Sequence, residues 1–252
     1  MTIDLTDKVV LVTGASRGIG AAVAARCGEA GATVAVHYGA SRTEAEALAK
    51  SLPHAAAFQA NLAHPEAANQ LFEAVLQRYG RVDVLVNNAG VSPAAPLDAS
   101  DETWLDVWTQ TIDVNLRAAA LLARAAVRHW LDRDEGGRLV TVASRASFRG
   151  DTADFIPYAA SKAGLIGLTR SIARAFGKQG IVAFDVAPGF TRTDMAQTFI
   201  DRYGEAYLLD DIALPSLTEP DDVARIILFL ASGLADHATG TTIDINAGSY
   251  VH

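Results

Sequence analysis

Short apolar runs alternate with longer amphipathic segments along the whole chain. The runs are typical of strands that are buried on both faces of a parallel sheet, and the amphipathic segments are typical of helices. We expect strands over residues 9–13, 33–38, 55–60, 82–87, 138–143, 181–187 and 242–246, and helices over residues 19–30, 44–51, 65–79, 102–131, 158–176 and 220–232. This alternation predicts one α/β domain over residues 1–252, a doubly wound parallel sheet of about seven strands with helices on both faces.

Two segments interrupt the alternation. Residues 145–157 follow no helical or strand period, and residues 191–216 are rich in polar and aromatic side chains. The second segment is the best candidate for a lid over a ligand. The single cysteine, Cys27, shares an apolar helix face with Ile19, Val23 and Ala30, so we expect a packed thiol.

Composition narrows the class of protein. Of the 252 residues, 50% are hydrophobic, which is enough for a large core, and the net charge of −8 argues against nucleic acid or an anionic membrane as a partner. No apolar run approaches a membrane span, and the first residues lack a secretion signal. The six histidines show no ligand spacing, so we expect a cytoplasmic protein without a metal ion.

Three glycines connect the first strand to the first helix. Gly14, Gly18 and Gly20 form the spacing G-x-x-x-G-x-G directly after the apolar run. A strand that turns through glycines into a helix N-terminus lets backbone N–H groups approach an anion closely. The turn lacks the Lys-Ser/Thr pair of a nucleoside-triphosphate loop. It therefore predicts a site for an anion such as a pyrophosphate, although glycine turns also occur in purely structural loops.

A second group of residues predicts proton transfer. Tyr158 and Lys162 are four residues apart at a helix start, so their side chains lie on one face. A fixed ammonium favours phenolate and lowers the pKa of tyrosine from about 10. Ser144, at the end of the fifth strand, is placed to hold a carbonyl oxygen, and Ser147 is the competing serine.

Six motifs in one order carry a family resemblance: Thr13–Gly20, Asn87–Gly90, Asn115, Ser144, Tyr158–Lys162 and Pro188–Met195. On these motifs the chain resembles the classical short-chain dehydrogenases/reductases, in the branch that includes 3-oxoacyl-carrier-protein reductases. Three features depart from that pattern: Asn61 stands where an aspartate is usual, the Gly-Arg pair before the last helix is missing, and residues 145–157 carry one extra residue.

The resemblance implies a role for each motif residue. Tyr158 would be the general acid and base, Lys162 would hold the nicotinamide ribose, Ser144 the substrate oxygen, and Asn115 a water that relays protons. The cofactor would be bound by Gly14, Ser16, Arg17, Gly18, Ile19, Gly20, Tyr38, Ser41, Arg42, Asn61, Leu62, Asn88, Ala89, Gly90, Tyr158, Lys162, Pro188, Gly189, Phe190, Thr191 and Thr193. An apolar substrate would contact Ser144, Phe155, Ile156, Tyr158, Phe190, Phe199, Tyr203 and Tyr207.

Three functional hypotheses follow. The first is an NADP(H)-dependent oxidoreductase that interconverts a small ketone and a secondary alcohol. The second is a 3-oxoacyl-carrier-protein reductase, which the acidic stretch Leu131–Gly137 disfavours because carrier proteins are themselves acidic. The third is a non-catalytic dinucleotide-binding redox sensor. The small and apolar faces of two long helices also predict a homo-oligomer, most simply a homotetramer.

The end of the second strand predicts the choice of cofactor. NAD-selective relatives carry an acidic residue there, whereas this chain has Tyr38. Arg17, Ser41 and Arg42 lie close to the same place, and arginine binds phosphate through paired hydrogen bonds. We expect kcat/KM with NADP(H) to be about tenfold or more higher than with NAD(H), which remains usable. Arg17→Ala should shrink this preference, and equal use of NADH by the unmodified protein would contradict it.

Overall fold

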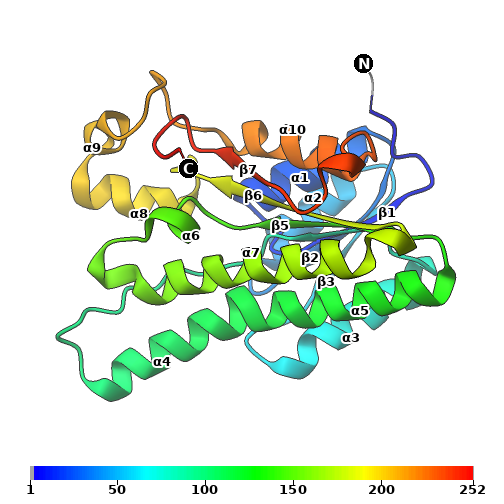
Figure 1. Ribbon diagram of the computed structural model, residues 1–252, viewed down its shortest axis with the longest axis horizontal. Coiled ribbons are helices and arrows are strands. Elements are labelled where there is room, and N and C mark those ends of the chain that lie inside the picture. The colour runs from blue at the N-terminus through cyan, green and yellow to red at the C-terminus, as the bar shows by residue number, and fades with distance from the viewer. Residues whose placement is uncertain (1–2, 252) are drawn as a thin grey trace.

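The seven strands within residues 3–251 form one parallel sheet. The computed structural model describes residues 3–251, apart from the side chains of residues 198, 202 and 203. The strand order is β3-β2-β1-β4-β5-β6-β7 (Figure 1). The strands are β1 (Val9–Val12), β2 (Thr33–Tyr38), β3 (Ala55–Gln59), β4 (Val84–Asn87), β5 (Gly137–Val142), β6 (Ile181–Pro188) and β7 (Thr242–Ile245). The predicted doubly wound α/β fold is confirmed.

Helices cover both faces of this sheet (Figure 1). One face packs against α1 (Gly18–Glu29), α2 (Arg42–Ser51) and α10 (Pro220–Ala231). The other packs against α3 (Pro65–Tyr79), α5 (Ala118–Arg133) and α7 (Ile156–Phe176). Each face has its own apolar core because the strands β1, β4 and β6 are buried throughout. No helix within residues 3–251 is long and apolar enough to cross a membrane.

Cys27 is part of the core beside α10. Its side chain is fully buried among apolar residues, and burial raises the pKa of the thiol to about 12. A thiol in this state is protonated and unreactive at neutral pH. The expected packed thiol is therefore present.

The predicted helix over residues 102–131 contains an irregular turn. It consists of α4 (Asp101–Ile112), a π-helical turn (Asp113–Arg117) and α5. A π-turn inserts one extra residue into the helix and re-aims the side chains around it. Here the turn carries Asn115, whose side chain is fully buried.

The two irregular segments also contain helices. Residues 145–157 include α6 (Ala146–Arg149) and a 3₁₀ turn (Ala153–Phe155), after which α7 begins two residues earlier than expected, with a proline in its first turn. Residues 191–216 include α8 (Asp194–Tyr203) and α9 (Glu205–Asp210), which lie together beyond the strand ends (Figure 1). Two further 3₁₀ turns cover Gly177–Gln179 and Asp236–Ala238.

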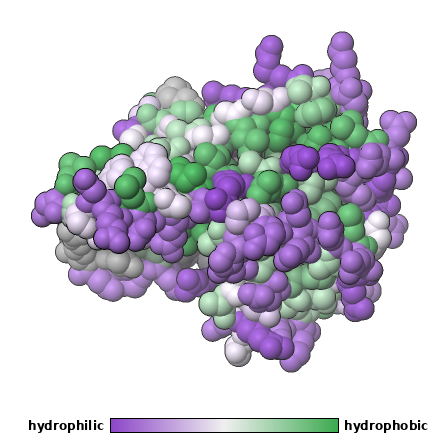
Figure 2. Space-filling view, turned by 90° about the horizontal axis from the view of Figure 1, so that it is seen from below, coloured by the Kyte–Doolittle hydropathy of each residue, from purple (hydrophilic) through white to green (hydrophobic). Residues whose placement is uncertain are grey.

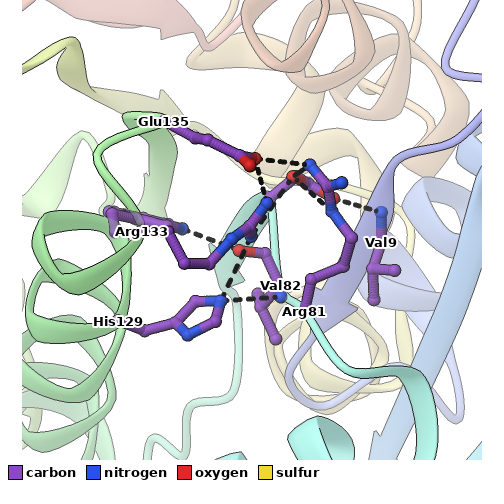
Figure 3. Close-up of polar contacts among 8 residues, drawn as sticks. Val9, Arg81, Val82, His129, Arg133 and Glu135 are labelled. Atoms are coloured by element: carbon purple, nitrogen blue, oxygen red, sulfur yellow. Dashed lines mark hydrogen bonds and ion pairs between the residues drawn. The ribbon is translucent and has the colours of Figure 1, made fainter.

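A cluster of charged side chains joins α5 to the amino ends of β1 and β4 (Figure 3). Asp83 accepts hydrogen bonds from the backbone N–H of Val9 at 2.8 Å and from Arg81 Nη2 at 2.5 Å. Arg133, at the end of α5, is ion-paired with Glu135 and lies 3.7 Å from Asp83. The cluster therefore fixes the edge of the sheet opposite the carboxyl ends of the strands.

One buried carboxyl in β6 makes stability depend on pH. Asp185 is fully buried, and neither of its oxygens has a hydrogen-bond partner in the described structure. The Thr169 hydroxyl does not serve as its donor, because it donates to Thr141 Oγ1 at 3.2 Å. Burial raises the pKa of Asp185 to about 7, above the value of about 3.9 expected in the unfolded chain. The folded protein then binds more protons between these values, so the free energy of unfolding falls as pH rises from about 4 to 7.

We therefore expect Asp185→Asn to be more stable than the unmodified protein by more than about 1 kcal/mol at pH 8, and by much less at pH 5. Urea unfolding at both values measures the difference. The exposed Asp98→Asn serves as a control that should show no such change. A difference that is the same at both pH values would show that Asp185 does not cause the dependence.

Candidate active site

A cavity of about 1360 Å³ opens at the carboxyl ends of β1, β4, β5 and β6. This is the edge at which open α/β sheets bind their ligands. Among the residues predicted from the sequence, the cavity is lined by Gly14, Ser16, Arg17, Gly18, Ile19, Ser41, Asn61, Leu62, Asn88, Ala89, Gly90, Ser144, Tyr158, Lys162, Pro188, Gly189, Phe190, Thr191, Thr193 and Phe199. The structure thus brings residues from most of the chain to one place.

The glycine turn is held in shape by the neighbouring strand β4. Thr13 Oγ1 accepts hydrogen bonds from the backbone N–H of Asn88 at 2.9 Å and of Ala89 at 3.0 Å. The Asn88 amide returns hydrogen bonds to the carbonyls of Thr13 at 2.8 Å and Gly14 at 3.1 Å. A Cβ on Gly20 would lie 2.3 Å from the Gly14 carbonyl oxygen. The turn therefore requires glycine and the Asn88 amide together.

His37 supports the same turn, and sequence reasoning missed it. Its Nδ1 accepts a hydrogen bond from the Gly14 N–H at 3.0 Å, so the ring proton lies on Nε2, which donates to the Ala60 carbonyl at 3.1 Å. Burial lowers the pKa of His37 to about 4, which keeps this neutral tautomer. A single histidine in an apolar strand does not by itself indicate a function. Its position at the carboxyl end of β2, where open α/β sheets bind ligands, is the signal that could have found it.

The N-terminus of α1 is open toward the cavity. Its N-cap residue, Arg17, is extended and offers no side-chain acceptor, and the first turn holds no acidic residue. The first N–H groups of a helix have no intrahelical partner and carry partial positive charge. The geometry of Gly14, Gly18 and Ile19 therefore fits the pyrophosphate of a dinucleotide.

Two residues expected at the adenosine end lie elsewhere. Tyr38 is 7% exposed and packs with Val34 and Val36 in the core beneath α1 and α2, because alternation along β2 turns His37 toward the cavity instead. Arg42 is outside the cavity lining and pairs with Glu46 one turn along α2, at 2.6 Å. These two predicted cofactor contacts are corrected.

Arg17 and Ser41 do line the cavity. The Arg17 side chain is 67% exposed and lies 2.9 Å from Asp194, the first residue of α8. An ion pair that is this exposed is weak. The guanidinium can therefore turn to a phosphate that binds nearby.

Ser144, Tyr158 and Lys162 meet at the centre of the cavity. Lys162 is 4% exposed, its Nζ donates to the Val142 carbonyl at 2.8 Å, and it lies 5.7 Å from the centroid of the Tyr158 ring. Ser144 Oγ accepts the N–H of Ala146 at 3.1 Å. Ser147, the competing serine, has a buried hydroxyl without a partner and lies outside the lining. The geometry favours Ser144.

Burial controls the protonation of this group. It raises the pKa of Tyr158 to about 12, against the opposing effect of the Ser144 hydroxyl, and lowers the pKa of Lys162 to about 8. The expected lowering of the Tyr158 pKa by Lys162 is not seen in this structure, where the groups that lower it are Ser144 and Arg145 and desolvation outweighs both. Tyr158 is consequently a neutral proton donor at neutral pH.

Asn115 lies behind the cavity wall and connects three segments. Its Nδ2 donates to the Val91 carbonyl at 2.9 Å and to Ser161 Oγ at 3.0 Å, while its Oδ1 accepts the Val91 N–H at 2.8 Å. Ser161 Oγ donates to the Tyr158 carbonyl at 2.7 Å. Both amide protons are therefore used in holding the loop after β4 against the first turn of α7.

Aromatic residues form the outer part of the cavity. Phe190 and Phe199 line it with their ring centroids 5.5 Å apart, and Tyr207 joins them. Phe155 packs behind Phe199 and is 7% exposed, and Ile156 is 40% exposed but outside the lining. These last two substrate contacts are corrected. The side chain of Tyr203, another predicted contact, lies outside the described residues.

Comparison with known proteins agrees with this geometry. A family described as enoyl-(acyl carrier protein) reductase matches residues 14–250. The 3-oxoacyl-[acyl-carrier-protein] reductase FabG of Staphylococcus epidermidis is 36% identical and covers 97% of this chain and 100% of its own length. The FabG of Aquifex aeolicus is 34% identical, with coverages of 99% and 100%. The chain belongs to the short-chain dehydrogenases/reductases.

Two solved structures show the same fold. A short chain dehydrogenase from Burkholderia cenocepacia J2315, solved in complex with NADP, has a TM-score of 0.89 and 37% identity over 97% of this chain and 98% of its own. A blue fluorescent protein from a metagenomic library, in complex with NADPH, has a TM-score of 0.90 and 36% identity over 98% and 100%. As a member of this family, the chain is an oxidoreductase acting on C=O and CH–OH groups.

Removal of one hydroxyl tests the assignment of Tyr158. We expect Tyr158→Phe to lower kcat by about 10²–10⁴-fold, the usual size of a general-acid contribution. Cofactor binding, measured by nicotinamide fluorescence, should be unchanged, and Tyr79→Phe on the remote helix α3 provides the matched control. Full turnover by Tyr158→Phe would show that another group supplies the proton.

Proposed function

We propose that the protein is an NADP(H)-dependent carbonyl reductase and alcohol dehydrogenase for small ketones and secondary alcohols. The observation that carries this proposal is the convergence of Ser144, Tyr158 and Lys162 in the cavity that also contains the open N-terminus of α1. A dinucleotide site and a proton donor in one cavity fit a reaction that moves a hydride and a proton together.

The residues divide the work as follows. The bound nicotinamide supplies or accepts the hydride. In the reduction, the Ser144 hydroxyl donates a hydrogen bond to the substrate oxygen and Tyr158 transfers its proton to that oxygen as negative charge develops. The buried Lys162 ammonium stabilises the phenolate that remains. Alcohol oxidation runs through the same groups in reverse. Asn115, in this proposal, would hold a water that relays protons to Lys162.

The preference for NADP(H) is supported by two observations. Two structural neighbours are solved with NADP or NADPH. In this chain, Arg17 and Ser41 line the cavity, and no carboxylate stands at the end of β2, where Tyr38 is turned into the core. A 2′-phosphate would therefore meet a guanidinium and a hydroxyl, without repulsion from that strand.

A 3-oxoacyl-carrier-protein reductase is the second candidate, and the names of the FabG relatives favour it. The acidic surface at the end of α5 disfavours this candidate. Arg133 is occupied by Glu135 and Asp83 in the cluster of Figure 3. Asp132 and Asp134 flank it in the sequence. An acidic carrier protein would meet repulsion here instead of a basic docking site.

This difference generates a direct comparison. We expect kcat/KM for free small ketones to exceed that for an acetoacetyl-carrier protein, because the docking surface is acidic. Stopped-time assays of NADPH consumption with a panel of ketones, and with the carrier-protein thioester, measure both values. Efficient turnover of the thioester at low micromolar concentration would favour the second candidate.

A non-catalytic redox sensor is a weaker alternative. Lys162 is buried beside Val142, and burial lowers its pKa to about 8. Burying an ammonium group in this way reduces the free energy of unfolding. A protein that only binds a dinucleotide has no need of this buried ammonium. The same ketone panel separates the two classes, because a sensor would turn over none of its members.

We also propose that the protein is a cytoplasmic homo-oligomer. Leu121 and Ala125 of α5 and Leu168 and Phe176 of α7 are only partly buried. The view from below shows a broad apolar area interrupted by polar side chains (Figure 2). Contacts between helices of this kind, repeated about two-fold axes, would give the expected tetramer.

A further inference from the structure

The residue that follows Ser144 is a buried arginine. Arg145 is 7% exposed, and its Cζ lies 4.4 Å from the centroid of the Phe190 ring. Its backbone N–H donates to the Pro188 carbonyl at 3.0 Å, which fixes it at the carboxyl ends of β5 and β6. A guanidinium in this position must be paired, because a lone buried charge is strongly unfavourable.

Its partner is a carboxylate of the segment over the cavity. Arg145 Nη1 lies 2.5 Å from Oδ2 of Asp211, the residue that follows α9. Arg149, one turn further along the chain, reaches the same oxygen at 3.2 Å. Two guanidiniums therefore share one carboxylate, although each can bind a carboxylate alone. Burial and the neighbouring charge of Arg149 lower the pKa of Arg145.

A second carboxyl, that of Asp151, also lies close to the two arginines. Asp151 lines the same cavity, and its Oδ1 accepts the N–H of Thr152 at 2.8 Å. Desolvation raises the pKa of Asp151, although both arginines oppose this effect. Burial therefore disfavours the charged form of Asp151, and Asp211 is the carboxylate that contacts both arginines directly.

The arginine pair is close to the reacting groups. Arg145 lowers the pKa of Tyr158 through its charge, whereas Asp151 raises it. Both charges thus act on the hydroxyl that transfers the proton. Arg145, Arg149 and Asp211 line the same cavity as Ser144. An anion on the pair would sit a short distance from a carbonyl held by the serine and the tyrosine.

We propose that Arg145 and Arg149 bind a carboxylate of the substrate, so that the preferred substrates are oxo acids and the corresponding hydroxy acids. This inference rests on the proposed carbonyl reduction. Asp211 holds the arginine pair before the substrate arrives, and the substrate carboxylate takes its place. The planar guanidinium over Phe190 is oriented in advance for two parallel hydrogen bonds, which distinguishes a carboxylate from a neutral group of equal size.

Matched pairs of substrates test this inference. Each oxo acid is compared with its primary amide, which has nearly the same size and no charge, in a series of increasing distance between the carbonyl and the carboxyl. We expect kcat/KM of the best acid to exceed that of its amide by about tenfold or more. Arg149→Gln should bring this ratio toward one. Asp211→Asn should raise it, mainly through a lower KM for the acid.

A control and two outcomes complete the test. Arg192→Gln removes an exposed arginine that pairs with Glu205 and Glu219 nearby, and should leave the ratio unchanged. If Asp211→Asn instead lowers turnover of acid and amide equally, the ion pair only fastens the lid and the inference is overturned. Preferred turnover of neutral ketones overturns it as well but leaves the proposed function intact. Turnover of no ketone at all overturns the proposed function itself.

Discussion

The close approach of backbone to backbone at the β1–α1 turn is the constraint on which the site depends. A side chain at Gly20 would overlap the Gly14 carbonyl, and Gly14 itself has a φ of +62°. Only glycine permits this approach. Once the turn is formed, His37 and Asn88 bind it from the two strands that flank β1. The open N–H groups of α1 are then directed into the cavity.

Desolvation governs the other end of the site. The same burial raises the pKa of Tyr158 to about 12 and lowers that of Lys162 to about 8, because it disfavours the charged form of each group. A neutral phenol and a weakly held ammonium proton are suited to passing a proton in either direction. Asn115 contributes by rigidity, because its bonds to Val91 and Ser161 hold the first turn of α7.

Much of the fold was predictable because burial on both faces makes strands recognisable as apolar runs. The seven strands and the meeting of Ser144, Tyr158 and Lys162 follow from this pattern and from the family motifs. The π-turn around Asn115 could not be predicted from the hydrophobic pattern, since one inserted residue barely alters helical periodicity. Tyr38 was misplaced for a similar reason: the family position marks the strand end, but alternation decides which side chain faces the cavity.

Contacts between distant residues were beyond such reasoning. Arg145 and Asp211 are 66 residues apart, and neither belongs to a periodic pattern. Their meeting changes the electrostatic description of the protein. The net charge of −8 describes mainly the surface, where charges are screened over about 8–10 Å at physiological salt. Inside the cavity, the open end of α1 presents N–H groups without intrahelical partners, and Arg145 and Arg149 share the carboxylate of Asp211. The two proposed anion sites therefore depend on these local groups and not on the net charge of the protein.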